Sequence, residues 1–136
     1  MIIFLDVKLI GGLYFKHEWR CQIAIDEMKT TLEALHLCIQ KAIKFENDHL
    51  YEFFIASSAR SPERVSYEVM NGRCMETLAS DMFPLSGNRK LFYWFDFGDD
   101  WMFQISCSSK SPEMAAPRLR YPRVVSEEGK KPVQYP

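Results

Sequence analysis

The sequence predicts an α+β fold in which an antiparallel sheet of about five or six strands packs one face on a single main helix. Three observations predict it. The start of the chain alternates between apolar and polar residues, one stretch has apolar residues at helical spacing, and two aromatic runs flank the sequence FDFGDDW at residues 95–101. A chain of 136 residues fits one domain.

The first two expected strands are residues 2–10 and 19–26. Both have an apolar face and a polar face, with Asp6 and Lys8 on the polar side of the first and Arg20 and Gln22 on that of the second. Gly11-Gly12 ends the first strand, and the short loop that follows predicts an antiparallel hairpin. The loop is longer than two residues, so the sequence leaves the register of this hairpin open.

The main helix is predicted over Thr31–Lys44. Thr30 has the character of an N-cap, and Glu33 three residues later completes a capping box. The polar residues Gln40, Lys41 and Lys44 fall on or near the side opposite an apolar face. That face consists of Leu32, Leu35, Ile39, Ala42 and Ile43.

Two further strands and one helical turn are expected between the helix and the aromatic runs. Residues 49–57 have apolar residues on both faces, which predicts a central strand covered on both sides. Residues 58–64 read as a surface loop, and 65–70 as a strand with Val65, Tyr67 and Val69 in phase. One helical turn is expected in ETLASDMF, residues 76–83, before Pro84.

The aromatic runs at residues 90–107 predict a β-hairpin. Aromatic and β-branched residues alternate on both sides of a Gly-Asp turn. We expect Gly98 to provide the backbone freedom for the reversal, and the neighbouring aspartates to suit turn positions.

The composition changes at Lys110, which predicts a domain over residues 1–109 and an extended tail over 110–136. The tail contains five prolines, which preclude a long helix, and its six basic and three acidic residues give it a charge of +3. We expect this proline-rich tail to lie across the domain as a clasp.

The overall composition limits the classes of function. Apolar residues make up 47% and the net charge is −1, which predicts a globular protein without the basic surplus of a general nucleic-acid binder. The four cysteines show no CxxC spacing, so reduced thiols acting as small hydrophobic residues are expected. No apolar run reaches the length of a membrane span, and the start of the chain lacks the features of a signal peptide. We therefore expect a cytoplasmic protein with no membrane association.

Three segments in order resemble one known family. They are EWRC at residues 18–21, TTLEALHLCIQKAIKFENDHLYEF at 30–53, and FYWFDFGDDW at 92–101. Together they resemble the plasmid pRiA4b ORF-3-like family over roughly residues 3–125. The resemblance implies a compact α+β domain of unknown biochemical role, with some relatives associated with insertion sequences. Phe103 stands where the family commonly has a histidine, and the chain ends without the family's acidic Pro- and Gly-containing segment.

Acidic and histidine side chains near the hairpin are the sharpest candidates for chemistry. A metal site would draw on Asp96, Asp99, Asp100, His36 and His49, although no HxxxH or HExxH spacing is present. The simpler interpretation is that Asp99 and Asp100 hold the turn, Asp96 pairs with a base such as Arg20, and the histidines cap or pack.

Other catalytic patterns are weak. Cys38 lies two residues after His36, and helical residues at that spacing point in different directions. Basic residues next to aromatic ones, as in Trp19-Arg20, are only loosely typical of nucleic-acid binding. Aromatic strands with free edges favour a partner protein or self-association equally well.

We therefore expect a non-enzymatic binding module in a mobile-element setting, with no catalytic residue, cofactor or metal. Its partner would be a protein or a nucleic acid. The alternatives are a metal-dependent hydrolase or nuclease that uses the hairpin carboxylates, and a nucleic-acid-binding protein. The candidate ligand-binding residues are Arg20, His36, His49, Asp96, Asp99, Asp100 and Trp101.

Overall fold

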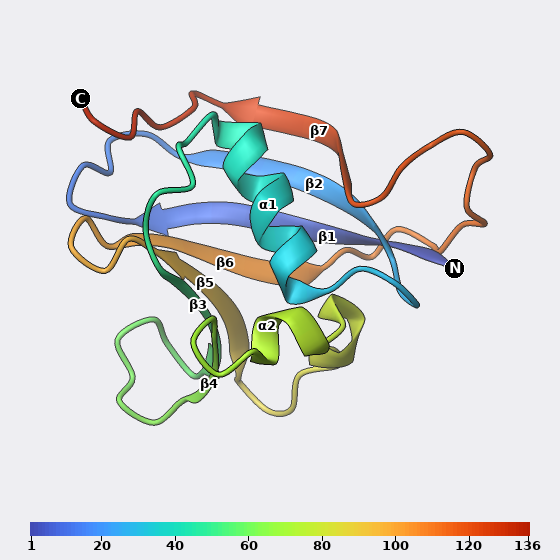
Figure 1. Cartoon of the computed structure of the whole chain (residues 1–136), viewed down its shortest axis with the longest axis horizontal. Coiled ribbons are helices and arrows are strands. Elements are labelled where there is room, and N and C mark those ends of the chain that lie inside the picture. Colours follow the sequence, from blue (N-terminus) through green and yellow to red (C-terminus); the bar gives the residue numbers. More distant parts are fainter.

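A computed structural model describes all residues, 1–136, as one mostly antiparallel sheet with helices on one side (Figure 1). The sheet has seven strands in the order β4-β3-β5-β6-β1-β2-β7. The strands are β1 Ile2–Gly11, β2 Trp19–Asp26, β3 Tyr51–Ala56, β4 Val65–Glu68, β5 Lys90–Phe95, β6 Trp101–Cys107 and β7 Arg123–Gly129. The helices are α1 Leu32–Ile43, the short α2 Arg73–Glu76, and the 3-10 turn η1 Ala79–Met82.

The predicted number of five or six strands was too low, because the expected tail contributes β7. This strand pairs antiparallel with β2 and extends the sheet at that edge (Figure 1). The prolines that predicted an extended tail stand outside it, with Pro122 just before Arg123 and Pro132 beyond Gly129. Between them, the β-branched residues of RVVS can pair without a missing N–H.

The two predicted hairpins are confirmed and meet at the centre of the sheet. β1 pairs antiparallel with β2, with Lys8 opposite Arg20 and Asp6 opposite Gln22. β5 pairs antiparallel with β6, with Phe95 opposite Trp101. The register of β1 against β6 then places Gln104 opposite Lys8. Polar residues of four strands, β6, β1, β2 and β7, consequently share one face of the sheet.

Helix α1 lies across the other face, as Figure 1 shows. Its N-cap is Thr31, whose hydroxyl accepts from the N–H of Ala34, so the predicted cap at Thr30 was wrong by one residue. Thr30 is instead buried, and its hydroxyl accepts from the N–H of Asp26 at the end of β2. The predicted Thr30–Glu33 capping box therefore does not form.

The apolar face of α1 packs into the main core as predicted. Gln40 differs from the prediction, because it is buried rather than solvent-facing. Its amide reaches the hydroxyl of Tyr93 on β5 at 3.0 Å, and this contact offsets part of the cost of burying a polar group. The core face of the sheet supplies large side chains, among them Trp19, Tyr51, Phe53, Tyr93, Phe95, Trp101 and Phe103.

The face of the sheet away from α1 has two small apolar clusters near its ends. One contains Phe54 and Phe92, and the guanidinium of Arg64 from the 57–64 loop stacks 3.9 Å over Phe54. The other contains Ile2 and Phe4 and is packed by Tyr121 and Lys110, both from the segment between β6 and β7. Between the two clusters no helix or loop covers the polar residues of β1, β2, β6 and β7. β3 is indeed buried on both faces, as its sequence predicted.

The turn between β5 and β6 is built differently from the expectation. Gly98 does not have a positive φ; the left-handed positions are Asp96 at φ 60° and Asp100 at φ 61°. Aspartate tolerates this conformation better than most residues, because its short side chain can hydrogen-bond the local backbone. The Asp96 carboxylate does so, accepting from the N–H groups of Gly98 and Asp99 at 3.1 and 3.2 Å.

The remaining elements agree in part with the sequence. The helical turn expected in residues 76–83 is η1, whereas α2 was not anticipated. All four cysteines are free thiols; Cys21 and Cys74 are buried, Cys38 is half-buried and Cys107 is exposed. None of the helices combines the length and apolar character needed to cross a membrane.

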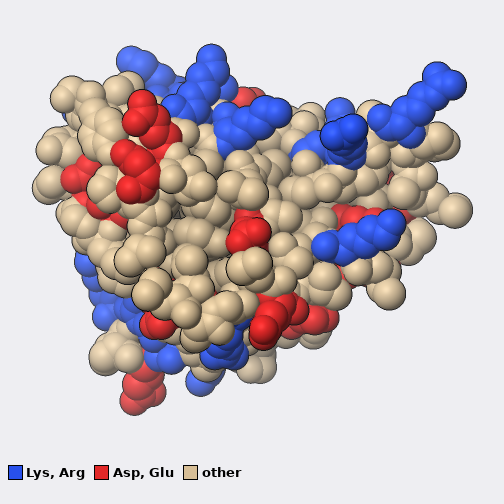
Figure 2. Space-filling model, in the orientation of Figure 1, with Lys and Arg blue, Asp and Glu red and all other residues tan.

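Charges on the α1 face are mixed. Figure 2 shows basic side chains along its upper edge, where Figure 1 places β7 and the loop leading into it, and acidic groups interspersed with further basic side chains below. This face therefore offers no broad surface of one sign, in keeping with the net charge of −1.

Candidate functional site

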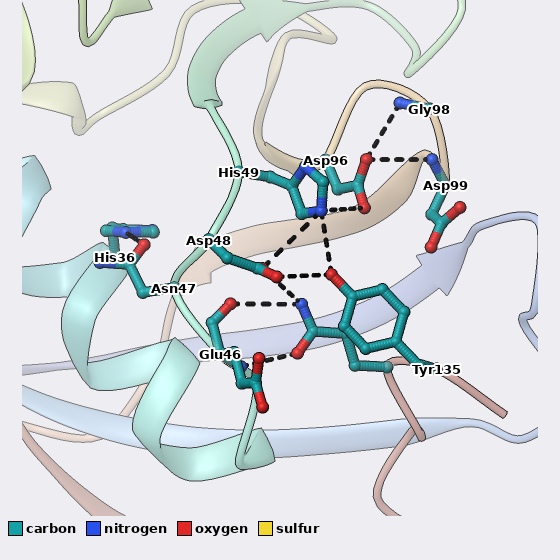
Figure 3. A network of polar contacts seen from close by, with 10 residues as sticks. His36, Glu46, Asn47, Asp48, His49, Asp96, Gly98, Asp99 and Tyr135 are labelled. Carbon is teal, nitrogen blue, oxygen red and sulfur yellow. Dashed lines mark hydrogen bonds and ion pairs between the residues drawn. The ribbon is translucent and has the colours of Figure 1, made fainter.

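Several predicted site residues meet on the α1 side of the molecule, in a set of polar contacts that we call the front network (Figure 3). It consists of His36, Glu46, Asn47, Asp48, His49, Asp96, Gln134 and Tyr135. At its centre, Nε2 of His49 lies 3.3 Å from a carboxylate oxygen of Asp96. Asp96 is buried, and its other oxygen holds the hairpin turn, so this carboxylate joins the turn to the segment before β3.

The end of the chain is fastened into the same network. The buried side chain of Gln134 accepts from the N–H of Glu46 at 2.6 Å and donates to the carbonyl of Glu46 and to Asp48. The hydroxyl of Tyr135 donates to Asp48 at 2.6 Å and lies 3.0 Å from Nε2 of His49. The hydrogen bond from Tyr135 lowers the pKa of Asp48, and the same bond raises the pKa of Tyr135 to about 12.

His36 lies on the buried side of α1 and contacts the rest of the front network only through Asn47. Its ring stacks on Tyr51 with the centroids 3.6 Å apart, and its Nε2 lies 2.7 Å from Oδ1 of Asn47. Nδ1 faces the hydroxyl of Tyr93, which also receives a hydrogen bond from Gln40. The Tyr93 proton therefore points to Nδ1, and Nε2 donates to Asn47. Burial lowers the pKa of His36 to about 4, so this imidazole is neutral at pH 7.

An open groove of about 370 Å³ brings the two predicted histidines together. His36, Asn47 and His49 line it, with apolar walls from Leu37, Leu50 and Tyr51. Both ring nitrogens of His36 and Nε2 of His49 already have partners, in Tyr93, Asn47 and Tyr135. Neither histidine hydrogen-bonds a serine or cysteine, which nucleophilic catalysis would require.

The other hairpin residues do not converge with Asp96. Asp100 pairs with Arg60 at 3.0 Å, and Asp99 contributes its backbone N–H to the turn. Trp101 is fully buried in the core. No group of three or more His, Cys, Asp or Glu side chains is arranged to hold a metal ion. The hairpin carboxylates thus do not form the cluster that a metal-dependent hydrolase or nuclease needs.

Arg20 lies far from the front network, on the opposite face of the sheet. The expected pairing of Arg20 with Asp96 is wrong, because Arg20 is on the polar face of β2 and Asp96 on the α1 side. Arg20 is instead among the residues lining a depression of about 410 Å³.

We call this region the polar depression and define it by two rows of side chains that cross the sheet. The strand register aligns the first row as Gln104, Lys8, Arg20 and Glu128. It aligns the second as Ser106, Asp6, Gln22 and Ser126. All eight residues are exposed or half-buried, and each has a polar group that can reach a ligand above the sheet.

Few polar groups of the depression have a close hydrogen-bond partner within the chain. The cation–anion distances from Lys8 and Arg20 to Glu18 and Glu128 are 3.7–3.9 Å, beyond normal hydrogen-bond length. The side chains of Gln104, Ser106 and Ser126 make no hydrogen bond, whereas Gln22 donates to Asp6 and Ser108. This is the reverse of the front network, where the side chains of His36, Asp96 and Gln134 all have close partners.

Sequence reasoning found Arg20 but missed the rest of this region. The signal was present, because Lys8, Asp6 and Gln22 were already assigned to the polar faces of the first two strands. Their convergence follows from the register of β1 against β2 and β6, which the sequence did not determine.

Comparison with known proteins identifies the relatives of this chain. The model of the family described as plasmid pRiA4b ORF-3-like protein matches residues 14–134. A crystal structure of a protein of unknown function from Methanosarcina mazei Go1 aligns with a TM-score of 0.70 at 22% sequence identity, covering 93% of this chain and 68% of that one. At this identity the likeness shows the fold alone. No curated protein matches the chain.

Proposed function

We propose that this chain, which belongs to the plasmid pRiA4b ORF-3-like family, is a non-enzymatic binding module that holds its ligand on the uncovered face of its sheet. The observation that carries the proposal is the polar depression. Eight polar side chains from four strands line a hollow of about 410 Å³. Gln104, Ser106 and Ser126 make no hydrogen bond with the rest of the chain, and the ion pairs of Lys8, Arg20 and Glu128 are 3.7–3.9 Å long.

The contrast with the rest of the same face supports this proposal. The apolar clusters at either end are covered, by Arg64 on one side and by Tyr121 and Lys110 on the other. The chain thus covers the parts of the face that are unfavourable in water and leaves open the part that can hydrogen-bond a ligand. A rigid sheet also holds the eight side chains at fixed spacing, which reduces the entropy lost on binding.

A non-enzymatic role is favoured by the types of residue in the depression. It contains lysine, arginine, carboxylates, amides and hydroxyls and no histidine, and the side chain of Cys21, the one cysteine along its lining, is buried in the core. We also propose a cytoplasmic setting, since reducing compartments keep cysteines as the free thiols seen in this chain. The plasmid named in the family description is in keeping with a mobile-element association.

The test is a map of binding by amide NMR on the full chain. Glucose, arginine, adenosine monophosphate and citrate serve as neutral, cationic and anionic polar probes at millimolar concentration. We expect at least one probe to give saturable shifts at β1, β2, β6 and β7 residues of the depression. Ser126→Trp, which fills the hollow, should abolish the shifts, whereas Lys41→Trp on the exposed side of α1 should leave them intact.

Two results would contradict the proposal. One is the absence of saturable shifts at the depression for all four probes. The other is a map centred on the groove of His36 and His49, because it would move the binding surface to the other side of the sheet.

A further inference from the structure

We infer that Lys8 and Arg20 form an oxyanion site, which binds the carboxylate or phosphate group of a small polar ligand. This inference rests on the proposed function and names the chemical group that the polar depression recognises. It is carried by the register of the two residues, by the position of one glutamate, and by the neutral groups around them.

The register places two like charges directly opposite each other. Lys8 on β1 is the cross-strand partner of Arg20 on β2. Side chains in such positions have Cβ atoms roughly 4.5–5.5 Å apart, and like charges there destabilise a sheet. The depression therefore retains an arrangement that is unfavourable for folding and favourable for binding an anion between the two cations.

A glutamate of the chain shows that one anionic group can meet both cations. The carboxylate of Glu18 lies 3.9 Å from Nζ of Lys8 and 3.7 Å from an Nη atom of Arg20. Its side chain is 68% exposed, so a ligand can displace it readily. Glu18 thus stands in for the oxyanion and competes with it.

The backbone near Glu18 is held in place by Gly129. This glycine has φ +88°, and a Cβ atom there would overlap the carbonyl oxygen of Glu18. The end of β7 and the loop before β2 therefore pack backbone to backbone. The backbone of Glu18 is consequently held in place next to Arg20, and its carboxylate does not depend on a freely moving loop.

Neutral and acidic neighbours restrict the ligand to a small one. The amide of Gln104 and the hydroxyls of Ser106 and Ser126 are free to hydrogen-bond uncharged parts of a ligand. Glu128 lies next to Arg20 in the first row, and Asp6 lies in the second row, two residues before Lys8 on β1. They would repel further negative charges, so the site suits one oxyanion on a polar molecule better than the repeated phosphates of a nucleic acid.

The inference is tested by titrating inorganic phosphate and, separately, acetate into the full chain at constant ionic strength, with chloride as the balancing ion. The readout is the amide signals of Lys8 and Arg20 and the Nε–H signal of Arg20. We expect saturable shifts with both anions. The double variant Lys8→Gln, Arg20→Gln should weaken binding at least tenfold, whereas Lys29→Gln, Lys90→Gln, which removes the same charge elsewhere, should change it less than twofold.

The phosphate affinity of Glu18→Gln, compared with that of Glu63→Gln, tests the role of Glu18 most directly. Because it removes the internal competitor, we expect it to tighten phosphate binding several-fold. Glu63→Gln removes one negative charge from an exposed loop and controls for net charge. Equal affinities in these two variants would overturn the inference, as would shifts that drift without saturation in every variant.

The outcomes also separate this inference from the proposed function. Saturable shifts at the depression with glucose or arginine, but not with phosphate or acetate, would overturn the oxyanion site and keep the binding module. The absence of saturable shifts at the depression with every probe would overturn both the oxyanion site and the binding module.

Discussion

The front network and the polar depression are both rich in polar side chains, but they use them in opposite ways. In the front network, Asp96, His49, Gln134 and Tyr135 make close contacts that join the hairpin turn, the segment before β3 and the end of the chain. In the depression, Lys8 and Arg20 have only distant partners, and Gln104 has none.

The difference teaches that a cluster of histidines and aspartates is not by itself a functional site. A polar group that is buried without a partner costs about 1–3 kcal/mol, so the buried members of the front network, His36, Asp96 and Gln134, must be satisfied internally for the chain to fold. Exposed polar groups carry no such requirement. The comparison therefore assigns stability to the front network and ligand binding to the depression, and this assignment can be tested residue by residue.

The largest change in the free energy of unfolding is expected from protonation of His36 as the pH falls. Its pKa is near 4 when folded and near the ordinary 6.5 when unfolded, so the unfolded chain takes up a proton first as the pH falls. The free energy of unfolding should decrease by about 3 kcal/mol between pH 6.5 and 4 through this residue, and not decrease further below pH 4.

Urea denaturation at pH 7 and pH 4 of the wild type and of His36→Gln measures this contribution. The carboxylates titrate in both proteins, so the difference between the two pH dependences isolates His36. His17→Gln, at an exposed histidine, is the matched control and should retain the full pH dependence of the wild type. A loss of stability that is equal in wild type and His36→Gln would contradict the assignment.

The second largest effect is expected at Asp96. Asp96→Ala removes the acceptor of two turn N–H groups and places alanine at φ 60°, so unfolding free energy should fall by about 2 kcal/mol. Asp96→Asn keeps a side-chain acceptor and tolerates this φ, so it should lose less than half as much.

Gly98→Ala in the same turn provides an internal check. Gly98 does not have a positive φ, and the nearest atom to an added Cβ is 3.5 Å away. The stability should therefore change by less than about 0.5 kcal/mol. A larger loss for Gly98→Ala than for Asp96→Ala would show that the glycine, and not the aspartate, forms the turn.

Two glutamines allow the same substitution in both regions. Gln134→Ala removes three hydrogen bonds of a buried side chain and should lower the free energy of unfolding by about 1–2 kcal/mol. Gln104→Ala in the depression removes no hydrogen bond, so thermal or urea unfolding should show a change below about 0.5 kcal/mol. Equal losses at the two positions would erase the distinction between the regions.

The smallest stability effect is expected from removing the cations of the depression. Lys8→Ala or Arg20→Ala relieves a like-charge cross-strand pair and breaks only distant ion pairs, so unfolding free energy should stay within about 0.5 kcal/mol of the wild type. A loss above about 2 kcal/mol in either variant would indicate that these residues serve the fold.

The parts of the fold that the sequence predicted have strong local signals. The helix follows from apolar residues at helical spacing, and the β5–β6 hairpin from aromatic alternation around a Gly-Asp turn. β7 was not predicted, because prolines on either side of Arg123–Gly129 hid a stretch that pairs only with β2. Its strand character depends on a neighbour far away in the sequence, and periodicity within seven residues does not reveal it.

The candidate site shows the same limit. His49 and Asp96 were both named as candidates, and the structure brings them together, yet their proximity depends on how the segment before β3 lies against the hairpin. Arg20 was named without Lys8, its partner in the depression. Their pairing depends on the β1–β2 register, which a loop of several residues leaves undetermined.

The most direct test of the central claim is one amide NMR map that reads both regions in the same titration of the wild-type chain. With phosphate added at constant ionic strength, we predict saturable shifts at Lys8, Arg20 and Gln104, and none at His36, His49 or Asp96. Saturable shifts at the histidines, without shifts at the depression, would contradict the account, because the binding surface would then be the front network.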